Sequence, residues 1–225
     1  MEPRYARNIP ALTEEECLIL RNKRVLVVGC GGLGGHIIDQ LARIGIGFLR
    51  VADGDVFEPS NLNRQLLSCV PLLGTSKAQS AAEHVSRVNP EMDVDAVPVF
   101  LTEENVGELV ADCDIVLDAL DNIPSRKILA AACSEAGIPY VYGAISGWVA
   151  QAAVSMPGDD LMEILFPEEV EIRDKSVLSF TPALCASLQV SLCVKLLTGR
   201  PVEAGTVYYF DLLNLELEAI PFCVI

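Results

Sequence analysis

The sequence predicts an α/β fold with a doubly wound, mostly parallel sheet, and three observations support this. Short aliphatic runs alternate with helical patterns, which is the order of a parallel sheet covered by helices on both faces. Hydrophobic residues make up 51% of the 225 residues but aromatic ones only 6%, as expected for buried aliphatic strands. Finally, the apolar run at 24–28 enters a glycine-rich turn at 29–35, which is typical of a Rossmann-like first strand and helix.

We expect one domain over residues 1–225, with its elements in three consecutive parts. Residues 1–23 form an N-terminal arm and a helix capped by Thr13. The nucleotide-binding core, 24–145, is expected to hold strands at 24–28, 48–52, 94–100, 115–118 and 140–144, and helices at 33–44, 76–89, 124–136 and after Thr102.

The last part, 146–225, changes character and adds a C-terminal antiparallel extension. A strand is expected at 148–156, with Trp148 as a packing anchor, and a helix at 181–197. A hairpin of strands at 207–210 and 215–220 closes the sheet. Between these elements, 157–179 reads as a long acidic loop that becomes ordered on a partner.

The charge and composition argue against several classes of partner. The chain carries 31 acidic and 16 basic residues, a net charge of −15, which repels nucleic acid and anionic membranes. No apolar run reaches the roughly 20 residues that span a bilayer, and the N-terminus lacks a secretory pattern. We therefore expect a cytoplasmic protein with no nucleic-acid and no membrane partner.

The eight cysteines are expected to be reduced structural thiols. They include no C-x-x-C pair, and the chain has only two histidines, so a closed zinc site would need ligands from remote positions. Several lie within apolar patterns, where cysteine behaves as a small hydrophobic residue.

The glycine turn indicates a nucleotide but not its chemistry. Gly29, Gly31, Gly32 and Gly34 place backbone amides and a helix N-terminus where phosphates can approach. Asp53, 19 residues after Gly34, ends the second strand and can accept hydrogen bonds from ribose hydroxyls. Dehydrogenases, flavoenzymes and adenylating enzymes all use such turns.

Two cations and a carboxylate favour attack on a triphosphate. Arg64 follows Asn61 in a polar loop, and Lys77 begins the next helix; together they can neutralise charge as pyrophosphate leaves. Asp121 comes just after a buried strand and can hold Mg²⁺ against ATP phosphates. Asp118 lies closer to the sheet and is expected to be structural, while Asp55 and Glu58 are expected to be solvated or turn-forming.

The order and spacing of these motifs resemble those of the ThiF/MoeB/HesA family, over about residue 4 to the final hairpin. The resemblance implies an enzyme that uses ATP and Mg²⁺ to adenylylate the C-terminal Gly-Gly carboxylate of a small ubiquitin-like sulfur carrier protein. By this resemblance Asp121 is catalytic and holds the magnesium, and Arg7 reaches into the partner subunit of a homodimer. The implied nucleotide contacts are Gly32, Asp53, Asn61, Arg64 and Lys77, with Asn122 beside the metal.

The sequence departs from the family in two respects. The cysteine pairs that bind zinc in many relatives are missing, so we expect no zinc site. The segment 168–179 contains no cysteine that could take the activated carrier, and Cys185 lies in the following helix, where packing is the expected role.

Other functions stay open at this point. One is a tRNA-modifying adenylating dehydratase of the same superfamily, which the acidic charge disfavours. Another is an NAD-dependent oxidoreductase, which would leave Arg64, Lys77 and Asp121 without a purpose. A non-catalytic carrier-binding protein is a third. The sulfur pathway, whether to thiamine, molybdopterin or tungstopterin, or cysteine, is not decided by the sequence.

Overall fold

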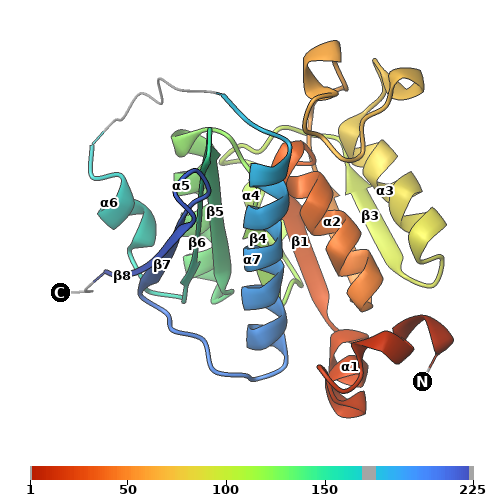
Figure 1. Cartoon of the computed structure of the whole chain (residues 1–225), viewed down its shortest axis with the longest axis horizontal. Coiled ribbons are helices and arrows are strands. Elements are labelled where there is room, and N and C mark those ends of the chain that lie inside the picture. Colours follow the sequence, from red (N-terminus) through yellow and green to blue (C-terminus); the bar gives the residue numbers. More distant parts are fainter. Residues whose placement is uncertain (1, 169–175, 223–225) are drawn as a thin grey trace.

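An eight-stranded sheet with the order β3-β2-β1-β4-β5-β6-β7-β8 forms the centre of the structure, a computed structural model that describes residues 2–168 and 176–222 (Figure 1). The first five strands in this order pair in parallel, and β6, β7 and β8 extend the sheet in antiparallel fashion. The strands are β1 Arg24–Val28, β2 Phe48–Ala52, β3 Asp93–Val97, β4 Ile115–Asp118, β5 Tyr140–Ser146, β6 Val149–Ser155, β7 Thr206–Asp211 and β8 Glu216–Pro221. The predicted fold class is confirmed.

Helices cover both faces of this sheet, because alternate residues of the central strands point to opposite sides. In β1, Val25 and Val27 belong to one core cluster with α2, α3 and α7, while Leu26 and Val28 belong to a second cluster with α4, α5 and α6. The helices are α1 Glu14–Leu20, α2 Gly32–Ile44, α3 Lys77–Val88, α4 Val106–Val110, α5 Ile123–Ala136, α6 Leu161–Leu165 and α7 Phe180–Leu197, with short 3-10 helices η1 Pro3–Asn8, η2 Pro59–Asn61 and η3 Val70–Leu72.

By length and composition α7 would suffice to cross a membrane. However, 56% of its 18 residues are buried inside the fold, where the helix packs on α2, β5 and β6. Such burial is what a core helix shows, and passing the length test alone is weak evidence for a span.

Two sequence expectations are wrong in detail. The fourth helix, α4, does not start at Thr102 but at Val106, because the Asn105 side chain accepts from the Thr102 amide and forms a turn first. The expected loop at 157–179 contains α6, which buries Leu161 in the second core cluster; residues 169–175 lie outside the described part. Trp148, expected to be a packing anchor, is 42% exposed, and its ring packs against that of Phe180.

The cysteines behave largely as expected. Six of the seven described thiols are buried and none of the seven is in a disulfide, while Cys69 is exposed. Cys223 lies outside the described residues. Among the described residues no group of three His, Cys, Asp or Glu side chains could hold a metal ion, and the absence of zinc stays a prediction.

Candidate active site

A cavity of about 680 Å³ lies at the carboxyl edge of the parallel strands. Residues from the ends of both β1 and β4 line it, and these neighbouring strands mark the point where the strand order reverses. Open α/β sheets bind ligands at this position. The cavity brings together the predicted residues Gly29, Gly31, Gly32, Asp53, Asn61, Arg64, Lys77, Asp121 and Asn122.

The turn between β1 and α2 is shaped by two glycines that pack against each other. Gly29 has φ +97°, a conformation that favours glycine. A Cβ on Gly34 would lie 1.8 Å from the Gly29 carbonyl oxygen. Gly34, predicted to bind the nucleotide, is not among the lining residues; the structure gives it this packing role instead. Because α2 begins at Gly32, its first amides have no partner within the helix and form a positive end.

Asp53 holds the glycine turn against the end of β2. One carboxylate oxygen accepts from the Cys30 amide at 2.7 Å, and the other accepts from the Asp55 amide at 2.8 Å. Carboxylate oxygens have further acceptor capacity, so contact with a ribose hydroxyl stays a prediction.

The two predicted cations lie on the same cavity wall, and each already has a partner. Lys77 is 7% exposed, and its Nζ lies 3.0 Å from Oδ2 of Asp55. The Asp55 side chain is 55% exposed, as expected of a solvated residue, but it also pairs with Lys77. Arg64 donates to the Ser60 carbonyl at 3.0 Å and to Oδ1 of Asn63 at 2.9 Å. Both guanidinium and ammonium groups are thus fixed close to the glycine turn.

The loop before α3 carries one further polar side chain, Gln65, for which we predicted no role. Gln65 is 6% exposed and lines the cavity, and its Oε1 is buried without a hydrogen-bond partner among the described residues. Its neighbour Asn61 is buried and accepts from the Glu58 amide at 3.0 Å. A buried polar atom without a partner is costly, so Gln65 is suited to meet a polar group that enters the cavity.

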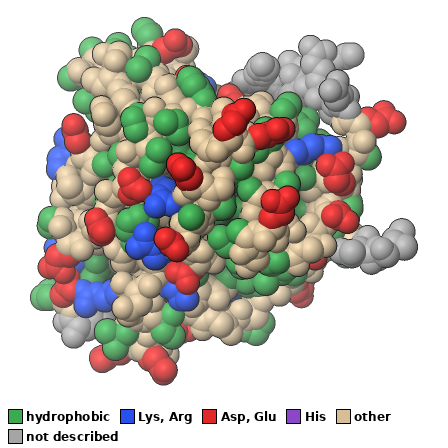
Figure 2. Space-filling model, turned by 180° about the vertical axis from the view of Figure 1, so that it is seen from behind, with side chains coloured by type: hydrophobic (Ala, Val, Ile, Leu, Met, Phe, Trp, Pro, Cys, Tyr) green, Lys and Arg blue, Asp and Glu red, His purple; other side chains and the backbone are tan. Residues whose placement is uncertain are grey.

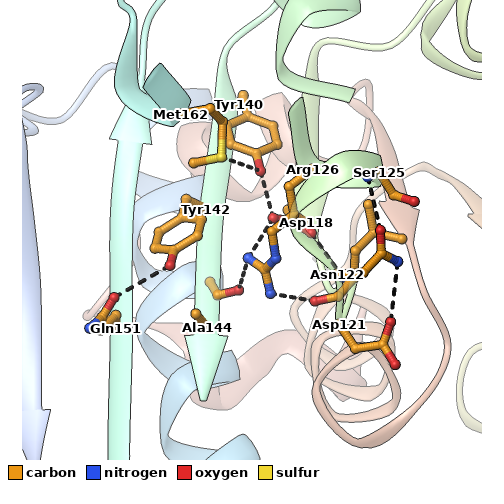
Figure 3. A network of polar contacts seen from close by, with 12 residues as sticks. Asp118, Asp121, Asn122, Ser125, Arg126, Tyr140, Tyr142, Ala144, Gln151 and Met162 are labelled. Atoms are coloured by element: carbon orange, nitrogen blue, oxygen red, sulfur yellow. Dashed lines mark hydrogen bonds and ion pairs between the residues drawn. The ribbon is translucent and has the colours of Figure 1, made fainter. Parts of the chain in front are cut away.

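Asp121 and Asn122 lie where β4 leads into α5 (Figure 3). Asn122 caps α5, because its Oδ1 accepts from the Ser125 amide at 2.9 Å. Its Nδ2 lies 3.4 Å from Oδ1 of Asp121, whose side chain is exposed to the cavity. Asp118 is fully buried and ion-paired with Arg126 at 2.8 Å, which confirms its structural role.

The other end of the cavity is more apolar. Tyr142, Ala144, Ile145, Phe166 and Val177 line it. Burial raises the pKa of Tyr142 to about 12, so its hydroxyl stays protonated and donates to Oε1 of Gln151 at 3.3 Å.

Val177, which comes shortly after the described part of the chain resumes at residue 176, also lines this apolar part of the cavity. The Val177 carbonyl accepts from the Asn63 side chain at 3.2 Å, and the Ser176 carbonyl accepts from the Gly147 amide at 2.8 Å. The described lining of the cavity therefore combines polar and cationic side chains with apolar ones.

The structure does not bring Arg7 to this cavity. Arg7 is exposed on η1, beside α1 and the C-terminal end of α2, at the opposite edge of the sheet (Figure 1). The arm is nevertheless fixed: Tyr5 is buried, and Arg4 donates to Asn89 at 2.6 Å. Arg7 can only reach such a cavity in a second copy of the chain.

The chain is similar to several known proteins over most of its length. The SAMP-activating enzyme E1 of Haloferax volcanii is 38% identical over 211 residues, which cover 90% of this chain and 78% of that protein. A sulfur carrier protein adenylyltransferase of Thermus thermophilus is 34% identical over 233 residues, covering 96% and 86%. Further relatives are longer, and the chain spans 49–59% of their length.

A solved structure supports the fold independently. The structure of E. coli MccB with ATP superposes with a TM-score of 0.84 at 20% identity, covering 99% of this chain and 72% of that one. The sequence model of the ThiF family matches residues 5–222. Since this match spans nearly the whole chain, and the motif resemblance points the same way, the chain belongs to the ThiF family.

Proposed function

We propose that this chain is an ATP-dependent adenylyltransferase that activates the C-terminal Gly-Gly carboxylate of a small ubiquitin-like sulfur carrier protein. The observation that carries the proposal is the convergence of the glycine turn, Arg64, Lys77 and Asp121 on one cavity. The names of the Haloferax and Thermus relatives point to the same reaction. The carrier carboxylate would attack the α-phosphorus of ATP, giving an acyl-adenylate and pyrophosphate.

The donor groups of the cavity fit a nucleoside triphosphate. The free amides at the start of α2 suit a phosphate, and Arg64 and Lys77 add a planar fork and a point charge. The unpartnered Oε1 of Gln65 and the carboxylate of Asp53 can accept hydrogen bonds from hydroxyl groups of the nucleotide. This set would orient the nucleotide and stabilise the charge that develops on the leaving pyrophosphate.

Asp121 is the residue that would hold Mg²⁺. It is an exposed carboxylate in the cavity, with the Asn122 side chain beside it, and hard oxygen ligands of this kind suit that ion. When bound, Mg²⁺ neutralises phosphate charge and helps to orient the triphosphate.

The chemistry needs no nucleophile from the protein. Cys185, the first cysteine after the segment 168–179, is fully buried, and burial raises its pKa to about 12. A protonated, inaccessible thiol cannot take the activated carrier. The adenylate is then the final product, and a separate sulfur donor attacks it.

A homodimer would complete the site. Arg7 stands exposed on an arm that is fixed by Tyr5 and Arg4, and the family resemblance brings it into the partner's cavity. An Arg7→Ala chain mixed with an Arg64→Ala chain should recover part of the activity through heterodimers with one intact site. Failure to recover any activity, with heterodimers present, contradicts the shared site.

The test of the proposal is ATP–pyrophosphate exchange against a panel of Gly-Gly-ending carriers from the thiamine, molybdopterin, tungstopterin and cysteine pathways. Each carrier is paired with a control that lacks its final glycine. Exchange that depends on one carrier and on its last glycine supports the proposal and assigns the pathway. If no carrier stimulates exchange while a tRNA does, or if NAD binds tightly, the proposal is wrong.

The acidic surface supports a protein partner rather than tRNA. Figure 2 shows acidic side chains spread across one whole face, interspersed with Lys and Arg. The net charge of −15 adds a long-range repulsion of nucleic acid. The proposed enzyme works in the cytoplasm, where carriers of this kind would meet it.

A further inference from the structure

We propose that the buried Asp118–Arg126 pair is a positioning device that holds the Asp121 carboxylate at the cavity; this inference rests on the proposed role of Asp121. Figure 3 shows the Asp118 and Arg126 side chains joined to each other beside Asp121 and Asn122. Both side chains are almost completely buried, with 0% and 5% exposed.

Asp118 and Arg126 each form a hydrogen bond with the backbone of Leu120. Oδ1 of Asp118 accepts from the Leu120 amide at 2.8 Å, and Nη2 of Arg126 donates to the Leu120 carbonyl. The next residue is Asp121. Because the peptide units on either side of Leu120 are held by side chains from β4 and α5, the point from which Asp121 projects is fixed.

Arg126 also ties this loop to the neighbouring strand. Its Nη1 donates to Oδ2 of Asp118 at 2.8 Å and to the Gly143 carbonyl at 2.7 Å. The same guanidinium lies 5.1 Å from the ring centre of Tyr142. Arg126 and Tyr142 both line the cavity, so Arg126 forms part of the cavity wall that it supports.

Asp118 is held in turn by two other elements. The Tyr140 hydroxyl of β5 donates to Oδ2 of Asp118 at 2.5 Å, and burial raises the pKa of Tyr140 well above its usual value, so that it stays a donor. Gln189 of α7 donates to the Asp118 carbonyl at 2.8 Å. A Cβ on Gly143 would lie 2.2 Å from the Gln189 side chain, which leaves room for glycine alone.

Stability alone is a poor explanation for this arrangement. A buried ion pair is often no more stabilising than apolar side chains of the same volume. The hydrogen bonds of Arg126, however, are directed at the carbonyls of Leu120 and Gly143, which flank the cavity. Partners of this kind, one shell behind a metal ligand, tune metal affinity by roughly 10- to 100-fold.

The test is Arg126→Lys, which keeps the charge but cannot bond two carbonyls and a carboxylate in one plane. The matched control is Arg50→Lys. Arg50 similarly bonds Asp95 and the carbonyls of Glu108, Leu109 and Ala111 at the end of α4, and it does not line the cavity.

Three readouts separate positioning from stability. In the free protein, hydrogen exchange at the Leu120 amide should become at least tenfold faster in Arg126→Lys. With a non-hydrolysable ATP analogue bound, Mn²⁺ affinity measured by electron paramagnetic resonance should fall about 10- to 100-fold. The kcat of exchange should fall while the KM for the carrier stays unchanged. Arg50→Lys should show none of these effects.

If Arg126→Lys matches the wild type in Leu120 exchange and Mn²⁺ affinity, or if Arg50→Lys changes them equally, the inference is wrong. Should Arg126→Lys fail to fold, Tyr140→Phe replaces it: loss of one bond to Asp118 should shift both readouts in the same direction, and unchanged values overturn the inference. Failure of the proposed function is distinguishable, because the wild type would then show no exchange reaction while the hydrogen-exchange result still stands.

Discussion

Alanine at Gly32 is expected to leave the fold intact and weaken nucleotide binding, whereas alanine at Gly34 is expected to damage the fold. A Cβ on Gly32 would lie 3.4 Å from Cγ of Arg64, a flexible side chain, at the first position of α2. Stability should stay the same or rise by up to about 1 kcal/mol, since alanine is the better helix former.

The same methyl group would fill space in front of the free amides of α2. Loss of one hydrogen bond to a charged phosphate costs about 1.5–3 kcal/mol, which corresponds to roughly 10- to 150-fold weaker ATP binding. At Gly34, by contrast, the Cβ would lie 1.8 Å from a backbone oxygen that cannot move cheaply. Overpacking of this kind costs about 1–3 kcal/mol or more, and each kcal/mol lowers Tm by about 2–4 °C in a domain of this size.

The assay pairs thermal unfolding with titration of a fluorescent ATP analogue for both variants. The two variants should differ: Gly32→Ala should keep its Tm and bind the ATP analogue more weakly, whereas the Tm of Gly34→Ala should fall by several degrees. Wild-type affinity in a folded Gly32→Ala protein would show that the phosphates lie elsewhere in the cavity. An unchanged Tm in Gly34→Ala would refute the close approach of Gly29 and α2.

Three further predictions concern single side chains. Lys77→Met should lower kcat of pyrophosphate exchange by about 10²- to 10³-fold with little change in Tm, and near-normal exchange would remove its assigned role. Cys185→Ala should keep exchange activity, and neither this variant nor the wild type should form a covalent adduct with the carrier. Mass spectrometry that finds an adduct only in the wild type contradicts this prediction. Hydrogen bonding by Arg200 lowers the pKa of Glu16 from 4.5 to about 2. Its carboxylate therefore stabilises the fold above about pH 4.5 and loses this effect as the pH falls towards 2. Glu16→Gln should lower Tm at pH 7 and match the wild type near pH 2, and a constant difference in Tm across this range would count against the ion pair.

The parts of the site that the sequence predicted are those encoded by local pattern. A strand that ends at Val28 and a helix that begins at Gly32 are set by residues within a dozen positions, and Asp53 and Asp121 follow the ends of apolar runs. In a parallel sheet, the ends of such runs meet at one edge. The convergence of these residues on one cavity therefore needed no knowledge of distant contacts.

The missed features depend on partners far along the chain. Arg126 reads as an ordinary polar position of α5, and its burial follows from Asp118 and from the Gly143 carbonyl, 17 residues away. Trp148 reads as a packing anchor, but the ring that it packs against belongs to Phe180, far along the chain. The five residues of α6 are too few for a periodic signal, and no side-chain cap announces the helix.

In the free protein, the two cations of the site already have hydrogen-bond or ion-pair partners, and this affects how the site can bind a polyanion. Lys77 is held by Asp55, whose side chain is 55% exposed, and Arg64 is held by the Ser60 carbonyl. Such half-exposed contacts are weak, about 0–1 kcal/mol, so a triphosphate can replace them at little cost. They nevertheless restrict two long side chains that would otherwise lose about 2 kcal/mol of rotamer entropy each on binding. In a protein of net charge −15, these contacts keep two cations at the glycine turn, so a triphosphate would meet a site that is already ordered.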